Sequence, residues 1–132
     1  MSDDKSIGAV EPVKDGTSQQ PVATAWRSDL SAVVCRLAKG DHALQDRPSR
    51  VAPVSNEVAE QMRRSVNDYG QKILPLPDES WRSSIAQWMG GYWEVLIDLW
   101  TAEEGESDLV LFVSARELDG DYTFEIVSLH VP

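Results

Sequence analysis

Acidic side chains are concentrated in one short stretch of this 132-residue chain. Asp98, Glu103, Glu104, Glu106 and Asp108 fall within eleven residues. Hard cations such as Ca²⁺ bind about six to eight oxygen ligands, and acidic clusters can supply them. The spacing does not match an EF-hand loop, which needs acids at alternate positions and a glutamate at the twelfth. We therefore expect no metal here; the alternatives are a solvated loop or a surface that binds a basic partner.

Two candidate residues lie inside an apolar run rather than in the acidic loop. Asp98 is flanked by leucine, isoleucine and tryptophan, and a buried carboxylate there needs hydrogen-bond donors, which backbone N–H groups or the hydroxyls of Thr101 and Ser107 would supply. Trp100 shares a strand face with Asp98, and tryptophan is favoured at contact surfaces. The predicted partner surface consists of Asp98, Trp100, Glu103, Glu104, Glu106 and Asp108.

Other residue types capable of chemistry are isolated. His42 and His130 have no partner at ligand spacing, and Cys35 lies within a helical pattern where buried thiols are inert. The chain has no phosphate-binding loop, dinucleotide fingerprint, nucleophile elbow or zinc-protease motif. The sequence therefore assigns no catalytic residue and no cofactor. Asp98 with His130 is the only visible pair that could serve a ligand pocket.

Negative charge is carried mainly by the last third of the chain. The formal net charge is −10, and residues 90–132 contain one arginine against ten acids. Nucleic acids and anionic membranes attract clustered lysine and arginine, so this distribution argues against both as partners. It favours a basic protein partner, or it keeps the chain in solution.

The cysteine content and hydropathy bear on the compartment. One cysteine allows no intramolecular disulfide, and no apolar run approaches the ~20 residues of a membrane span. The first sixteen residues lack the apolar region of a secretory signal. We expect a cytoplasmic protein.

Hydrophobic periodicity predicts three helices in the first two thirds of the chain. Residues 1–21 are polar and rich in glycine and proline, which predicts a disordered N-terminal tail followed by a single domain over residues 22–132. Apolar residues recur at helical spacing over 24–39, 56–69 and 79–89. Ser55 and Gly70 are suitable caps for the second helix.

The period then changes to two, which predicts strands over 92–101, 108–118 and 122–131. Asp119-Gly120 is a strong hairpin signal, and a two-residue loop would place Leu118 opposite Asp121 and Val113 opposite Ile126. The inner face would then carry Leu109, Leu111, Val113, Ala115, Phe124 and Ile126, with Val127 and Leu129 on the other face. The fold class is α+β: about three helices followed by a three-stranded antiparallel β-meander, with the helices packed on the sheet.

A resemblance supports this strand–loop–strand arrangement. The run from Trp93 to Thr101, followed by Glu103-Glu104-Gly105 and Ser107-Asp108-Leu109, resembles the signature of a bacterial domain family of unknown function. The resemblance covers about an eighth of the chain. It implies a bacterial source and a strand–loop–strand layout, and it implies no chemistry.

Two functional hypotheses follow from these observations. The first is a small acidic interaction protein that binds a basic protein, comparable in composition to immunity proteins that neutralise basic nuclease toxins. The second is a small-molecule-binding domain with a cystatin-like pocket, in which Asp98 and His130 would line a cavity. A solid core with the acids outside would favour the first hypothesis, and a buried pocket lined by these two residues would favour the second.

Overall fold

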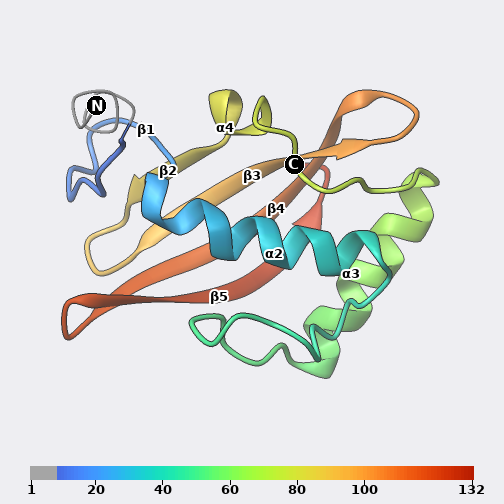
Figure 1. Ribbon diagram of the computed structural model, residues 1–132, viewed down its shortest axis with the longest axis horizontal. Helices are drawn as coiled ribbons and strands as arrows, with labels where there is room; N and C mark the ends of the chain where they lie inside the picture. Colours follow the sequence, from blue (N-terminus) through green and yellow to red (C-terminus); the bar gives the residue numbers. More distant parts are fainter. Residues whose placement is uncertain (1–8) are drawn as a thin grey trace, which may run out of the picture.

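The computed structural model describes residues 9–132, which form one antiparallel sheet with helices packed on it. The strands are β1 (Gln20–Pro21), β2 (Ile85–Trp88), β3 (Trp93–Thr101), β4 (Gly105–Leu118) and β5 (Asp121–His130), and they lie in sequential order in the sheet (Figure 1). The helices are η1 (Thr24–Trp26), α2 (Arg27–Ala38), α3 (Asn56–Tyr69) and α4 (Ser80–Ser83). The α+β class is confirmed, but the sheet has five strands where the sequence predicted three.

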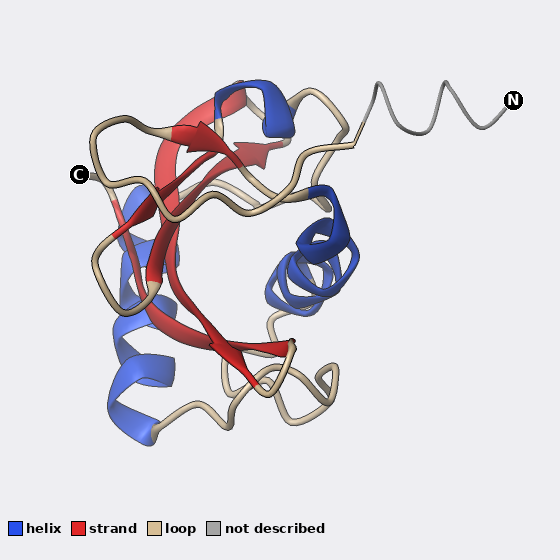
Figure 2. Cartoon of the chain, turned by 90° about the vertical axis from the view of Figure 1, so that its left-hand side faces the viewer, coloured by secondary structure: helices blue, strands red, loops and turns tan. Residues whose placement is uncertain are grey.

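The core lies between α2 and the concave side of the curved sheet (Figure 2). The buried stripe of α2 consists of Leu30, Val33, Val34 and Leu37. Strand β3 faces it with Trp93, Val95, Ile97 and Leu99, each at most 2% exposed. The period-two pattern of β3 thus defines an inner face that packs on α2 and an outer face that does not.

The β4–β5 hairpin confirms the register predicted from Asp119-Gly120. Leu118 pairs with Asp121 and Val113 with Ile126, and the predicted inner-face residues are buried. The predicted position of Leu129 on the outer face is wrong, because the register shifts between Phe112 and Val113. One extra β5 residue beyond Ile126 reverses the alternation, so Leu129 is fully buried opposite Leu111.

The third predicted helix, over 79–89, is wrong in its second half. The helix α4 ends at Ser83, and residues from Ile85 to Trp88 form β2 instead. This segment pairs with β3 through a hairpin in which the N–H of Met89 donates to the carbonyl of Tyr92 at 2.8 Å. A short run of apolar residues spaced by three and four fits either element, and here pairing with β3 decides.

The first two helices form where the sequence predicted them. Residues 24–38 are helical, with one 3₁₀ turn before α2, and α3 has the predicted bounds. The hydroxyl of Ser55 accepts from the N–H of Val58 at 3.1 Å, and Gly70 has a φ of 78° at the C-terminal end. No helix in the described part of the chain is long and apolar enough to cross a membrane.

Part of the predicted N-terminal tail, residues 1–21, lies within the described residues. Residues 1–8 lie outside the described residues. The rest of the segment lies against the sheet: Gln20 pairs with Ala86, and the indole N–H of Trp93 donates to the carbonyl of Val13 at 2.9 Å. A polar segment can dock in this way because its main-chain carbonyls supply the contacts, which composition does not reveal.

Candidate functional site

The outer face of the sheet brings together four of the six residues that the sequence selected. Trp100 on β3 pairs with Glu106 on β4, and Asp98 pairs with Val110. Because side chains alternate along a strand, these residues and Asp108 lie on the face opposite the core. The antiparallel pairing therefore assembles Asp98, Trp100, Glu106 and Asp108 at one end of the sheet.

An irregularity in β4 adjusts the positions of these acids. The β3–β4 register shifts between Asp98 and Trp100. At this point the Ser107 hydroxyl donates to the carbonyl of Leu99 at 2.7 Å and accepts from the N–H of Leu109 at 3.1 Å. Ser107 thus substitutes for backbone pairing where the ladder is broken.

The hydroxyls expected to donate to the Asp98 carboxylate have other partners. The hydroxyl of Thr101 donates to the side chain of Gln71 at 2.6 Å, and that of Ser107 is bonded to backbone. Asp98 is half-buried, so its carboxylate does not need the donors that a fully buried one would. Its carboxylate is therefore left facing the outer surface, with no hydrogen-bond donor among the described residues.

The carboxylates of Asp98, Glu106 and Asp108 border a groove of about 370 Å³. Its lining comes only from β3, β4 and the end of the chain: Asp98, Glu106, Ser107, Asp108, Val110, Val131 and Pro132. Val110 is 6% exposed yet lies outside the core cluster, because it faces the outer side. Val131 is 50% exposed. The groove therefore combines an apolar floor with an acidic border, which suits a side chain that has an aliphatic stem and a cationic end.

Glu103 and Glu104 lie apart from this groove. The main-chain N–H of Lys72 donates to the Glu103 carboxylate at 3.3 Å, and the hydroxyl of Tyr69 donates to that of Glu104. The bond to Glu104 is the main cause that raises the pKa of Tyr69. These two acids therefore fasten the β3–β4 turn to the end of α3, a role that sequence spacing could not distinguish from partner binding.

Trp100 lies beside Gly105 of the β3–β4 turn. Gly105 has a φ of 77°, and a Cβ built on it would lie 3.4 Å from the Trp100 ring. The indole Nε1 of Trp100 is buried without a hydrogen-bond partner in residues 9–132. The ring is half-buried on the outer face and borders the acidic end.

An apolar band continues from the groove along the outer face. Its residues are not among those predicted for the partner surface. Leu96, Phe112 and His130 are half-buried there, and Val127 is 47% exposed. The rings of Phe112 and His130 are stacked, with centroids 4.4 Å apart. The apolar residues at outer positions of β4 could have indicated this band. The register shift in β5 made its full length unpredictable from the sequence.

Asp98 and His130 share this face but do not form a catalytic or pocket pair. Each is opposite Val110 in the register, so a strand separates them, and no hydrogen bond joins them among the described residues. The Nδ1 of His130 instead lies 3.2 Å from the hydroxyl of Ser128. Their arrangement is an open surface, with the core closed behind it.

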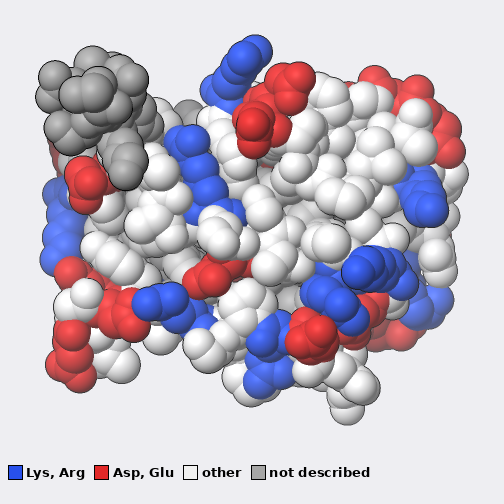
Figure 3. Space-filling view, viewed as in Figure 1, with Lys and Arg blue, Asp and Glu red and all other residues white. Residues whose placement is uncertain are grey.

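Charge is distributed unevenly over the molecule. Acidic side chains gather over the β3–β4 turn, at the upper right of the view in Figure 3. In the described part of the chain, no group of three or more histidine, cysteine or acidic side chains has metal-binding geometry.

A family model identifies the family of the chain. A family model matches residues 34–132, which is most of the chain. The chain belongs to the family described as Domain of unknown function (DUF7668). No curated protein and no solved structure matches it. The DUF7668 region contains α3, α4 and β2–β5, and hence the whole groove. The bacterial source implied by the sequence resemblance stays a prediction.

Proposed function

We propose that this domain binds a basic protein partner through the outer face of its sheet, at the acidic end. The observation that carries the proposal is the groove in which the carboxylates of Asp98, Glu106 and Asp108 border the apolar floor at Val110. A lysine or arginine of the partner would place its stem on the floor and its charge at the border.

The apolar band next to the groove supports a macromolecular partner. Leu96, Phe112 and Trp100 supply large side chains beside the charges, and interfaces commonly combine aromatic anchors with a charged rim. The acids would steer a basic partner toward this face and raise the association rate. A second copy of this acidic chain would be repelled by the same charges. The compositional analogy with immunity proteins points to the same kind of partner.

A model ligand can test whether this face selects basic amphipathic chains. The probe is a synthetic peptide of alternating leucine and lysine, titrated into the ¹⁵N-labelled protein and followed by NMR. We expect shifts confined to the outer face around Asp98, Trp100, Glu106 and Val110. The affinity should fall as salt rises, because the Debye length is about 8 Å at physiological ionic strength.

Two charge-matched triple variants make the test specific. The groove variant is Asp98→Asn/Glu106→Gln/Asp108→Asn, and the control, which removes the same number of charges elsewhere, is Asp46→Asn/Glu57→Gln/Asp119→Asn. We expect the groove variant to lose most of the affinity and the control to keep it, while both stay folded because exposed charges contribute little to stability. Equal losses in the two variants would show that only net charge matters and would refute the proposal.

A further inference from the structure

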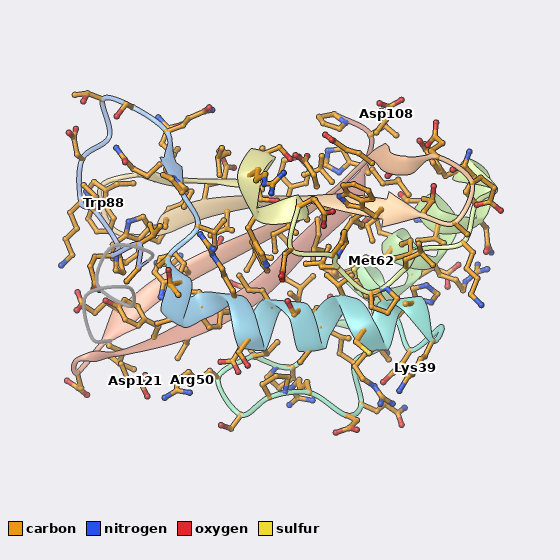
Figure 4. All side chains as sticks on the ribbon, turned by 45° about the horizontal axis from the view of Figure 1, so that its top comes forward. Lys39, Arg50, Met62, Trp88, Asp108 and Asp121 are labelled. Carbon is orange, nitrogen blue, oxygen red and sulfur yellow. The ribbon has the colours of Figure 1, made fainter. Side chains whose placement is uncertain are left out.

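A second contact region lies at the opposite end of the sheet from the acidic groove. Figure 4 shows Trp88 at one end of the molecule and Asp108 at the other. Residues 10–19, which we call the strap, cross this end before the chain enters β1. The region is formed by Gln87 and Trp88 of β2, Trp93 of β3 and Glu117 of β4.

The strap is bound mainly through its main chain. The indole N–H of Trp93 donates to the carbonyl of Val13 at 2.9 Å, and the side-chain amide of Gln87 donates to the carbonyl of Gly16 at 3.2 Å. Carbonyl groups are present in every peptide, so these two contacts do not select a side chain. A Cβ at Gly16 would lie 3.0 Å from the carbonyl oxygen of Trp88, so the segment needs glycine or a small shift at this position.

One strap side chain adds selectivity. The ammonium of Lys14 lies 2.8 Å from the carboxylate of Glu117 and 5.6 Å from the centre of the Trp88 ring. A carboxylate and an aromatic face together recognise a cation. The receptor side is therefore built for an extended segment that carries a lysine or arginine at this position.

The strap buries few side chains, and its first residue, Val10, exchanges two hydrogen bonds with Thr24, at 2.7 and 2.9 Å. Among its residues only Val10 and Pro12 are half-buried and the others are exposed, whereas Val22 and Ala23, just after β1, are buried in the core. Segments with few buried apolar contacts open at low free-energy cost. In addition, β1 covers only Ile85 and Ala86, so the edge of β2 is unpaired by any strand at Gln87 and Trp88 in the described part of the chain.

We propose that this region is a docking site for an extended, lysine- or arginine-bearing segment of a partner protein, which the strap occupies as a built-in competitor. Displacing the strap exposes the Trp93 N–H, the Trp88 ring and the Glu117 carboxylate to the incoming segment. The receptor residues lie within the range matched by the family model, and the strap lies before it. The site is separate from the acidic groove and does not depend on it.

The test uses the full chain with a weakened strap. In Lys14→Glu a negative charge faces Glu117, so the strap should be displaced more easily while the core stays intact. The probes are two synthetic peptides with the sequence of residues 9–21, one unchanged and one carrying glutamate in place of the lysine. Binding is followed through the NMR signal of the Trp93 indole N–H, and near-ultraviolet circular dichroism checks that the variant is folded.

We expect the unchanged peptide to bind the Lys14→Glu protein roughly ten-fold more tightly than the glutamate peptide. The glutamate peptide loses both the ion pair with Glu117 and the cation–π contact with Trp88. It should bind the unmodified chain more weakly, because the strap competes. In the variant Glu117→Lys, where Lys14 of the strap faces a lysine, the preference between the two peptides should reverse.

Two results would overturn the proposal. One is a failure of selective binding, seen either as equal affinity for both peptides or as no change in the Trp93 signal with either peptide. The other is a concentration-dependent dimer of the unmodified chain that dissociates when the peptide is added, since that would assign the site to the strap of a second copy. Sedimentation equilibrium with and without the peptide measures this outcome.

Discussion

Single side chains complete the hydrogen bonding at the edges of the sheet. The Gln61 amide donates to the carbonyl of Leu129 at 2.8 Å and accepts from its N–H at 3.1 Å, as a neighbouring strand would. On β3, Ser84 accepts from the N–H of Asp98 at 2.9 Å and Ser80 donates to its carbonyl at 2.6 Å. An uncovered edge invites pairing with another chain, and these side chains occupy the groups that such pairing would use.

The role of Gln61 gives a prediction at the residue scale. Gln61→Ala leaves both backbone groups of Leu129 without their partner, which should lower the free energy of unfolding by about 1–3 kcal/mol. Urea denaturation measures the loss, and amide exchange should accelerate at Leu129. Asn67→Ala, at an exposed position of the same helix, is the control and should change stability by less than about 0.5 kcal/mol. An equal effect of both changes would mean that helix propensity, not the edge contact, is responsible.

At the scale of elements, β3 is the strand that connects the core with the candidate site. Its inner residues pack on α2, whereas Leu96, Asp98 and Trp100 face outward. The burial alternates without interruption along the whole strand. The two faces should therefore respond differently to the same kind of substitution.

Ile97 and Leu96 provide this comparison, because they are adjacent and similar in size. Ile97 is fully buried in the core, so Ile97→Ala should cost about 2–5 kcal/mol through the cavity that it leaves. Leu96→Ala on the half-exposed outer face should cost less than half as much and should weaken binding of the leucine–lysine peptide. Thermal and urea unfolding give the stabilities. Similar costs for the two variants would contradict the assigned faces.

At the scale of the whole molecule, the acidic turn and α3 are fastened together. The hydroxyl of Tyr69 donates to the Glu104 carboxylate and accepts from the N–H of Asp108 at 3.1 Å. The carbonyl of Trp100 also accepts from the N–H of Leu74 at 2.8 Å. These bonds connect the end of α3 and the segment after it to the β3–β4 turn.

The raised pKa of Tyr69, caused first by its hydrogen bond to Glu104, gives this connection a pH dependence. The folded state retains the phenolic proton to higher pH than the unfolded chain, whose tyrosines titrate near about pH 10. The contribution to stability is therefore complete below pH 10 and is lost as the pH rises through the folded-state pKa. Tyr69→Phe should be less stable than the unmodified chain at pH 8, and the difference should shrink above pH 10.

Urea denaturation at a series of pH values from 8 to about 11 measures this effect. Tyr92→Phe is the control, because no hydrogen bond of the Tyr92 hydroxyl to a carboxylate is present among the described residues. A constant difference between Tyr69→Phe and the unmodified chain across this range would contradict the role of the Tyr69 proton.

Local patterns were sufficient for much of the fold. The helical stripes, the Ser55 and Gly70 caps and the Asp119-Gly120 turn predicted α3, most of α2 and the β4–β5 register from the turn as far as Val113, because each is fixed by neighbouring residues. The inner face of β3 followed in the same way from its period of two. The outer position of Asp98, Trp100 and Asp108 could also be anticipated from this period. Glu106 was expected in the loop before residue 108, whereas β4 begins at Gly105.

Tertiary contacts decided the rest. Residues 85–88 became a strand because β3 offered an unpaired edge, and residues 9–21 docked because Trp93 and Gln87 needed carbonyl acceptors from a distant part of the chain. Glu104 was separated from the other acids by a bond to Tyr69, 35 residues away in sequence. Such contacts depend on surfaces that exist only after the sheet has formed, so no local pattern in the sequence encodes them.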